Sequence, residues 1–193
     1  MIDELTFDED THTYRMGERI VPSVTQILAD LGFINTDFFD DESADRGRKV
    51  HKLTELWDQE ALDEDSVDPR LKGYLDAWIS FVRTEGFTWI AIEKRIFHPT
   101  YWYAGTLDRK GVNQRGKTIL LDIKTGVPSK WHSFQLGGYL LCEPADEIWT
   151  VHLKKDGRFS VEYHKKDESI ADWKAIAWTF RLREGLWTTS SKE

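Results

Sequence analysis

Two aspartates and a lysine in one stretch, Asp108, Asp122 and Lys124, could together bind a divalent cation and activate water. Carboxylate oxygens are the ligands that Mg²⁺ prefers, and an amine beside them can orient or polarise a nucleophile. Residues 118–124 (TILLDIK) are apolar and rich in β-branched side chains, and Gly126 follows them, so they predict a buried strand. Because side chains alternate along a strand, Asp122 and Lys124 share a face, and we expect the opposite face to be core.

The partner of this strand is predicted immediately upstream. Residues 102–108 read as a strand, and turn-forming residues centred near Arg115 separate the two segments. Such a hairpin would place Asp108 opposite Asp122. Facing carboxylates repel each other, so the pair calls for a compensating cation. That cation is either a divalent metal ion or Lys124, bridging both aspartates at a solvated strand end.

Four short segments resemble the PD-(D/E)XK nuclease motif in the form found in RecB-type nuclease domains and phage-type exonucleases. Residues 105–108 (GTLD) and 122–126 (DIKTG) match its two acidic segments. Residues 135–139 (QLGGY) look like its Gln-x-x-x-Tyr motif, and residues 46–51 (RGRKVH) resemble its metal-binding histidine segment. The four occur in the family's order, which makes their joint match far more specific than any one of them.

The resemblance implies a restriction-endonuclease-like α/β fold, with an αβββαβ core and a mixed central sheet flanked by helices. It also implies a metal-dependent exonuclease that hydrolyses phosphodiester bonds at DNA ends, similar to the mitochondrial genome-maintenance exonucleases. The implied metal ligands are His51, Glu93, Asp108, Asp122 and the carbonyl of Ile123. The implied catalytic residues are Lys124, Asp108, Asp122, Gln135 and Tyr139. Hard oxygen ligands favour Mg²⁺, and a histidine makes Mn²⁺ acceptable, as one or two ions.

Two of the implied ligands could instead have purely structural roles. His51 lies beside the apolar stripe of a helix predicted over 43–61, where it could reach the aspartates or be a packing or surface histidine. Gly47, one turn earlier, would let a backbone or a phosphate approach this helix closely. Glu93 either joins the metal site or pairs with a neighbouring basic side chain, Arg95 or Lys94.

A second helix, predicted over 129–142, carries Gln135 and Tyr139 four residues apart and hence on one face. Gly137 and Gly138 lie between them. Each glycine costs a helix interior about 1 kcal/mol relative to alanine, so we expect this helix to pack closely on the sheet or on nucleic acid.

The net charge of −8 is unevenly distributed along the chain. Residues 94–132 hold eight basic and two acidic side chains, whereas residues 1–93 hold nine and 22. Phosphate binding needs local positive charge, so the motif region could bind DNA although the whole chain is acidic. The candidate DNA contacts are Arg48, Arg109, Lys110, Lys130 and Trp131. For several of them a position in a solvated charged turn fits the pattern equally well.

The remaining patterns complete one predicted domain, 1–193, with an N-terminal hairpin and first helix in 1–30, a sheet and motif core in 87–165 and a C-terminal helix in 167–186. The further predicted elements are a hairpin over 5–14, a helix capped by Ser23 and Gln26, an acidic loop over 32–45, a helix from Pro69 to a stop at Gly86, and strands at 87–97, 147–153 and 159–163. In the strand at 87–97, Trp89, Ala91, Glu93 and Arg95 are expected on one face. The tail after Trp187 is expected to be disordered.

The composition restricts the class of protein. A single cysteine, Cys142, excludes a disulfide framework and the four-cysteine iron–sulfur cluster of some nuclease relatives. We expect a soluble, cytoplasmic protein of a bacterial or phage-infected cell, because no signal peptide and no apolar run of about 20 residues is present. The expected partner is DNA, single- or double-stranded, with a recombinase, helicase or single-strand-binding protein as possible protein partners. An endonuclease and a non-catalytic DNA-binding module are the alternatives.

Overall fold

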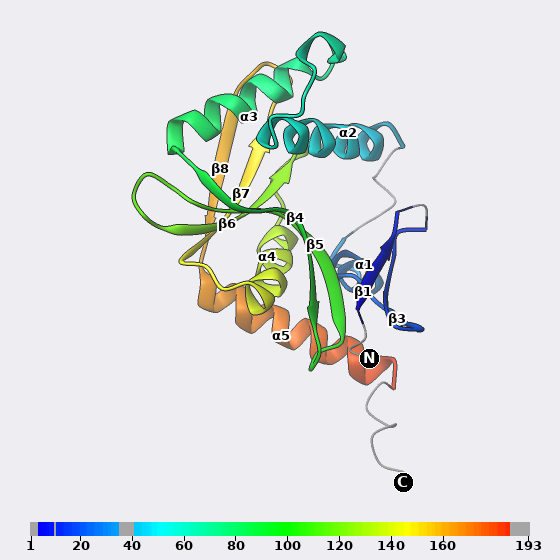
Figure 1. Ribbon diagram of the computed structural model, residues 1–193. Helices are drawn as coiled ribbons and strands as arrows, with labels where there is room; N and C mark the ends of the chain where they lie inside the picture. Colours follow the sequence, from blue (N-terminus) through cyan, green and yellow to red (C-terminus); the bar gives the residue numbers. More distant parts are fainter. Residues whose placement is uncertain (1–3, 10, 35–40, 186–193) are drawn as a thin grey trace.

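A five-stranded mixed sheet with helices on both faces forms the centre of the computed structural model, which describes residues 4–9, 11–34 and 41–185 (Figure 1). The strand order is β4 (Thr88–His98), β5 (Tyr103–Val112), β6 (Thr118–Lys124), β7 (Glu147–Leu153) and β8 (Phe159–His164). Neighbouring strands are antiparallel except β6 and β7, which are parallel. Parallel strands need a crossover connection, and α4 (Trp131–Cys142) provides it.

The other elements lie before and after this unit. They are β1 (Leu5–Asp8), β2 (Thr13–Met16), β3 (Arg19–Val21), α1 (Val24–Asp30), α2 (Asp41–Asp58), the 3₁₀ helix η2 (Glu64–Ser66), α3 (Lys72–Glu85) and α5 (Lys166–Arg183). The order from α3 to β7 is the αβββαβ arrangement that was predicted. The predicted α/β class, a mixed sheet flanked by helices, is confirmed.

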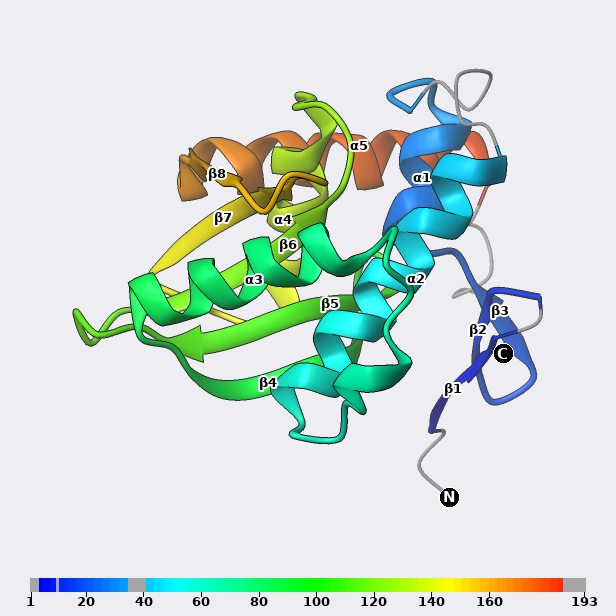
Figure 2. The ribbon, with the colours of Figure 1, turned by 90° about the horizontal axis from the view of Figure 1, so that it is seen from above.

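Strand β6 is buried on both faces. Ile119, Leu121 and Ile123 pack under α2 and α3, whereas Leu120 packs against α4 and α5 on the opposite face. In Figure 2, α2 and α3 lie nearest the viewer over the strands, with α5 beyond them. The prediction of a buried strand is confirmed, and the face that carries Asp122 is core as well, because two helical layers enclose the sheet.

The β5–β6 hairpin has the predicted register. Arg109 pairs with Leu121 and Val112 pairs with Thr118, so the hairpin is centred at Arg115. Asp108 then lies opposite Asp122, one position beyond the last paired residues.

Strand β4 departs from simple alternation. A β-bulge between Trp89 and Ala91 inserts Ile90, so that Trp89 packs on the α2–α3 side and Ala91 on the α4 side. The predicted common face for Trp89, Ala91, Glu93 and Arg95 was wrong for this reason. Glu93 adds a second irregularity, because its φ of 46° lies in the left-handed region that a non-glycine residue seldom adopts.

Several element ends differ from the sequence-based expectation. Helix α2 begins at Asp41, inside the stretch that was expected to be a loop. Helix α3 begins at Lys72 rather than at Pro69, since the Asp68 carboxylate accepts hydrogen bonds from the backbone and side chain of Arg70 and forms a separate turn. The expectation for the tail after Trp187 lies outside the described residues.

The glycines of α4 pack against α5. A Cβ atom at Gly137 would lie 2.1 Å from the carbonyl oxygen of Ser169, and one at Gly138 would lie 2.9 Å from the Trp173 ring. The surface to which α4 packs at these glycines is thus a helix rather than the sheet or nucleic acid. By contrast, nothing lies within 4 Å of a Cβ atom at Gly47 on α2.

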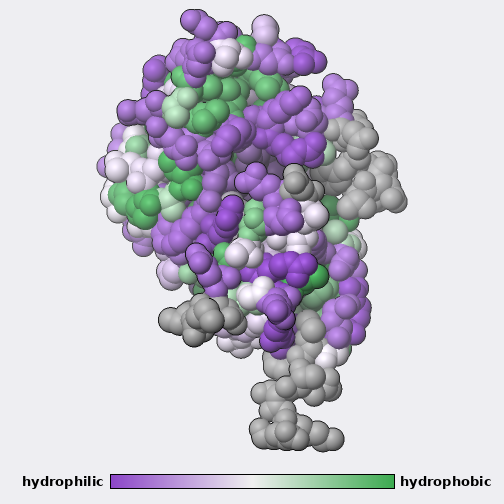
Figure 3. Space-filling view, turned by 45° about the vertical axis from the view of Figure 1, so that its right-hand side comes forward, coloured by the Kyte–Doolittle hydropathy of each residue, from purple (hydrophilic) through white to green (hydrophobic). Residues whose placement is uncertain are grey.

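The face drawn in Figure 3 is mainly hydrophilic, with hydrophobic residues gathered near the top of the view. Within residues 4–9, 11–34 and 41–185, none of the helices is both long and apolar enough to cross a lipid bilayer.

The contrast between Gly137 and Gly47 predicts opposite effects of the same substitution. Gly137→Ala should lower the free energy of unfolding by about 1–3 kcal/mol through overpacking against α5. Gly47→Ala should raise it by up to about 1 kcal/mol, since alanine is the better helix former and the space is open. Urea unfolding of both variants measures this, and equal effects would contradict the α4–α5 contact.

Candidate metal centre

Three ligand-type side chains from three elements converge at the end of the β5–β6 hairpin. They are His51 of α2, Glu93 of β4 and Asp108 of β5, and their ligand atoms all lie within 4.8 Å of one another. His51 Nδ1 lies 3.6 Å from Asp108 Oδ1 and 3.9 Å from Glu93 Oε1. The structure therefore brings together three of the predicted ligands, although they are far apart in the sequence.

Strand β6 fixes the orientation of this cluster through Ile123. The backbone N–H of Ile123 donates a hydrogen bond of 2.6 Å to Asp108 Oδ2, and its carbonyl accepts one of 2.9 Å from His51 Nε2. With Nε2 donating, Nδ1 is the atom turned toward the carboxylates. Holding a ligand histidine by a backbone carbonyl is a common arrangement in metal sites. The Ile123 carbonyl, itself a predicted ligand, accepts this hydrogen bond.

Burial and charge act in opposite directions on His51. Burial lowers its pKa, but the Asp108 and Glu93 carboxylates more than offset this and raise the pKa to about 9. Burial also raises the pKa of Asp108, against the effect of His51. The cluster thus holds a proton where a metal ion could lie.

Asp122 lies next to this cluster but outside it. Its side chain is fully buried, and burial raises its pKa although Lys124 opposes the shift. Lys124 Nζ donates to Asp122 Oδ1 over 2.8 Å, while Oδ2 is buried with no hydrogen-bond partner in the part of the chain that the structure describes. A buried carboxylate oxygen without a donor is costly, and a cation would satisfy it. With imidazole and carboxylate donors alongside, the residues fit a divalent ion such as Mg²⁺ or Mn²⁺.

A hydrogen-bonded chain continues from Lys124 into α4. Gln135 Oε1 accepts from Lys124 Nζ over 3.2 Å, and Gln135 Nε2 donates to the Tyr139 hydroxyl over 2.9 Å. The motif resemblance also implies that Tyr139 approaches the DNA, but its side chain is only 4% exposed and has almost no surface to offer a DNA strand. Its ring packs instead on Gly105, where a Cβ atom would lie 2.7 Å from it. This contact explains why residue 105, three residues before Asp108, is a glycine.

Arg109, an expected DNA contact, is fully buried instead. Its guanidinium pairs with Asp58 Oδ2 at 2.6 Å and Glu93 Oε1 at 2.7 Å, and it also donates to Thr54 Oγ1. It has no exposed surface to offer a phosphate, so this expectation was wrong. For Glu93, the basic partner is therefore Arg109 rather than Arg95 or Lys94.

The other expected DNA contacts differ in exposure. Lys110 is 12% exposed and pairs with Glu143 at 3.0 Å, so its charge is compensated within the protein. Arg48 has a 72% exposed side chain, and Lys130 is also exposed. Trp131 is partly buried, with Lys124 Nζ 5.0 Å from its ring centroid. Arg48, Lys130 and Trp131 are thus the members of the set with surface available.

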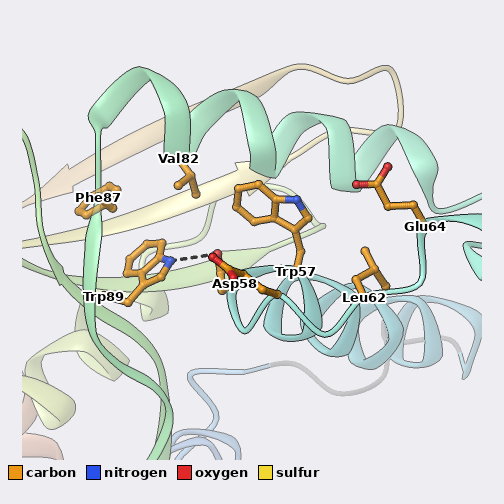
Figure 4. A pocket seen from close by; sticks show the side chains of 8 residues that line it. Trp57, Asp58, Leu62, Glu64, Val82, Phe87 and Trp89 are labelled. Atoms are coloured by element: carbon orange, nitrogen blue, oxygen red, sulfur yellow. Dashed lines mark hydrogen bonds between the residues drawn. The ribbon is translucent and has the colours of Figure 1, made fainter.

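Sequence reasoning missed the partner of Arg109. Asp58, at the end of α2, accepts hydrogen bonds from the indoles of Trp78 and Trp89 and lies in a pocket between α2, α3 and β4 (Figure 4). Glu60 and Glu64 also line this pocket, and their charge opposes phosphate binding there. Nothing in the sequence pattern marked Asp58, because an aspartate at a helix end is usually solvated.

The solved structures to which this chain is similar include two with low sequence identity. No family model matches the chain, and no curated protein matches its sequence. Among solved structures, LHK-Exo in complex with dAMP is 14% identical, covers 84% of this chain and 87% of its own, and has a TM-score of 0.49. SSO0001 is 17% identical, covers 83% and 84% respectively, and has a TM-score of 0.36.

The buried pairs of Arg109 predict a large effect of its removal. Arg109→Met should lower the free energy of unfolding by about 3–5 kcal/mol, because Asp58 would remain buried without its cation. Arg115→Met, which removes an exposed pair with Glu147, is the control and should cost less than about 1 kcal/mol. Urea unfolding measures both, and a loss for Arg109→Met no larger than the control's would contradict the buried pairing.

The raised pKa of His51 predicts a pH-dependent stability in EDTA. The pKa of His51 is about 9 in the folded protein, against an ordinary value of 6.5. Protonated His51 therefore stabilises the folded state fully below about pH 6.5, and this stabilisation is lost as the pH rises through about 9. The melting temperature should fall over this range, and less steeply in His51→Gln. Added Mn²⁺ should restore more stability at the upper end, where the proton has left. Identical pH profiles for the two proteins would exclude His51 as the titrating group.

Proposed function

We propose that this protein is a divalent-metal-dependent deoxyribonuclease that acts at DNA ends. The observation that carries the proposal is the meeting of the His51, Glu93 and Asp108 cluster with Asp122, whose buried Oδ2 has no hydrogen-bond donor among the described residues. Lys124 lies beside this carboxylate with its side chain 18% exposed. Carboxylates and an imidazole can hold the metal ion that assists phosphodiester hydrolysis, and a lysine beside them can act on the attacking water.

The metal ligands would be His51, Glu93, Asp108 and Asp122, with the Ile123 carbonyl as a further oxygen donor, for one or two Mg²⁺ or Mn²⁺ ions. When bound, such an ion lowers the pKa of a water molecule and offsets charge on the scissile phosphate. The left-handed backbone of Glu93 supports a functional role for this residue, because strained conformations concentrate at functional sites.

Lys124 would act on the nucleophile from a fixed position. Asp122 Oδ1 and Gln135 Oε1 both accept hydrogen bonds from its amine, and the Trp131 ring lies 5.0 Å away. An amine held in this way can orient water and donate a hydrogen bond to a phosphate oxygen. Gln135 is then a positioning residue, and Tyr139 orients Gln135 from the buried side.

DNA would approach over the start of α4 and the exposed side of α2. Lys130 and Arg48 supply positive charge there, and Trp131 has ring surface for stacking on a base. The open space at Gly47 leaves room for a phosphate close to α2. Action at DNA ends rather than within the strand follows the motif resemblance. A helicase, recombinase or single-strand-binding protein that delivers DNA ends fits this role.

A non-catalytic DNA-binding module is the second candidate, and one observation favours it. Glu93 is paired with Arg109, and Asp122 with Lys124, so the protein's own cations balance part of the negative charge at this site. A non-catalytic module would rely on these pairs rather than on an ion. Such a module would not be stabilised by Mg²⁺ or Mn²⁺.

The nuclease proposal predicts metal-dependent DNA degradation that depends on Lys124. End-labelled single- and double-stranded DNA should be degraded in Mg²⁺ or Mn²⁺ but not in EDTA, and circular single-stranded DNA should survive. Lys124→Ala should reduce the rate by about 100-fold or more. Lys117→Ala, an exposed lysine in the β5–β6 turn, is the matched control and should retain the rate.

Each other outcome has a defined meaning. Cleavage of circular DNA would indicate an endonuclease. Full activity of Lys124→Ala would exclude the role given to this lysine. DNA binding without cleavage, together with a melting temperature that metal ions do not change, would establish the non-catalytic module.

A further inference from the structure

A second group of ligand-type side chains lies where α4, β7 and β8 meet. It consists of His132 in the first turn of α4, His152 in β7 and Glu162 in β8. The two histidines are 2% and 3% exposed, and the Glu162 side chain is 36% exposed. Two buried imidazoles thus face one carboxylate that reaches solvent. None of these residues belongs to the centre at His51.

The spacing of the ligand atoms suits a small cation. His152 Nε2 lies 2.9 Å from Glu162 Oε2, and His132 Nδ1 lies 3.7 Å from the same oxygen. All three ligand atoms lie within 4.8 Å of one another. A tetrahedral ion with bonds of about 2.0–2.1 Å holds its ligand atoms roughly 3.3 Å apart. The observed distances lie on both sides of that value, so side-chain adjustment alone could form the site.

The hydrogen bonds of both imidazoles orient them for ligation. His152 Nδ1 lies 3.1 Å from the Gly126 carbonyl, to which it donates, and this leaves Nε2 facing Glu162. The backbone N–H of Ser129 donates to His132 Nδ1 over 3.3 Å, so this nitrogen is unprotonated, and a bound ion would replace this long hydrogen bond. At His152 Nε2, a bound cation would balance the charge of the Glu162 carboxylate, which lies 2.9 Å away.

We propose that His132, His152 and Glu162 form a second cation site, selective for Zn²⁺ or a similar transition-metal ion. Two imidazoles with one carboxylate suit Zn²⁺, Co²⁺ or Ni²⁺, whereas Mg²⁺ prefers oxygen donors. Three protein ligands leave a fourth position for water on the side of Glu162. The protein would thus bind Mg²⁺ or Mn²⁺ at the centre that contains His51 and a transition-metal ion at the site that contains His132.

The proposed ion would stabilise the segment between β6 and α4. His152 Nδ1 bonds to the Gly126 carbonyl, and His132 lies in the first turn of α4, so the two histidines flank the connection that leads from Lys124 to Lys130. An ion joining them to Glu162 of β8 would lock this connection onto the sheet. The proposal stands independently of the nuclease function, because it concerns binding and local order only.

The test measures Zn²⁺ binding in an Asp108→Asn background, which weakens the first centre. The chelator-treated protein is titrated with Zn²⁺ in excess Mg²⁺, and native mass spectrometry counts the ions. One Zn²⁺ per chain is expected. Adding His152→Gln should weaken its binding by about 100-fold or more. Adding His164→Gln, a neighbouring imidazole that bonds to Thr150, is the matched control and should leave binding unchanged.

A second measurement needs no substitution in the proposed site. Co²⁺ added to the Asp108→Asn protein should show the intense visible absorption of four-coordinate cobalt. Weak absorption, typical of six-coordinate cobalt, would overturn the proposal, as would displacement of Zn²⁺ by equimolar Mg²⁺. If His152→Gln does not fold, Glu162→Gln replaces it, since this side chain is partly exposed. Unchanged Zn²⁺ affinity in the folded variant would also overturn the proposal.

Discussion

Burial of carboxylates between two apolar layers is the constraint on which this structure depends. Strand β6 has no solvated face, yet it carries Asp122 two residues before its end, and the neighbouring strand carries Asp108 at the same level. Neither charge can be solvated there, so the protein must supply donors and cations. The backbone N–H of Ile123 in β6 donates a hydrogen bond to Asp108, which also lies beside His51 of α2, and Lys124 pairs with Asp122. The need to compensate these two buried carboxylates therefore connects the sheet to a helix that covers it.

Glu93 joins two networks that otherwise have different roles. Its Oε1 atom is 2.7 Å from the Arg109 guanidinium and 3.9 Å from His51 Nδ1. Arg109 continues to Asp58 and hence to the α2–α3 side of the sheet, whereas His51 belongs to the candidate centre. An ion that takes Glu93 as a ligand competes directly with Arg109. The affinity of the centre for that ion then depends partly on the buried pair of Arg109 with Asp58, which lies outside the centre.

The sequence predicted the parts of the fold that depend on local pattern. The β5–β6 register followed from a symmetric turn about Arg115, and the proximity of His51 and Asp108 followed from the motif resemblance. Arg109 was misjudged because charge alone was considered. Its neighbours Leu107 and Gly111 belong to a strand buried on both sides, and an arginine there needs a buried partner. That partner, Asp58, comes from a different layer, which no local pattern can reveal.

The bulge in β4 has a consequence for which changes in chain length this protein can tolerate. Ile90, the inserted residue, is 58% exposed, so its identity is weakly constrained. Trp89 and Ala91 pair with Gly111 and Lys110, which are consecutive residues of β5, so the two side chains already lie on the opposite faces that neighbouring strand residues have. Deleting Ile90 would therefore leave a regular strand with Trp89 still donating to Asp58. Homologous chains should accordingly vary freely in residue type here, and some should lack this residue altogether.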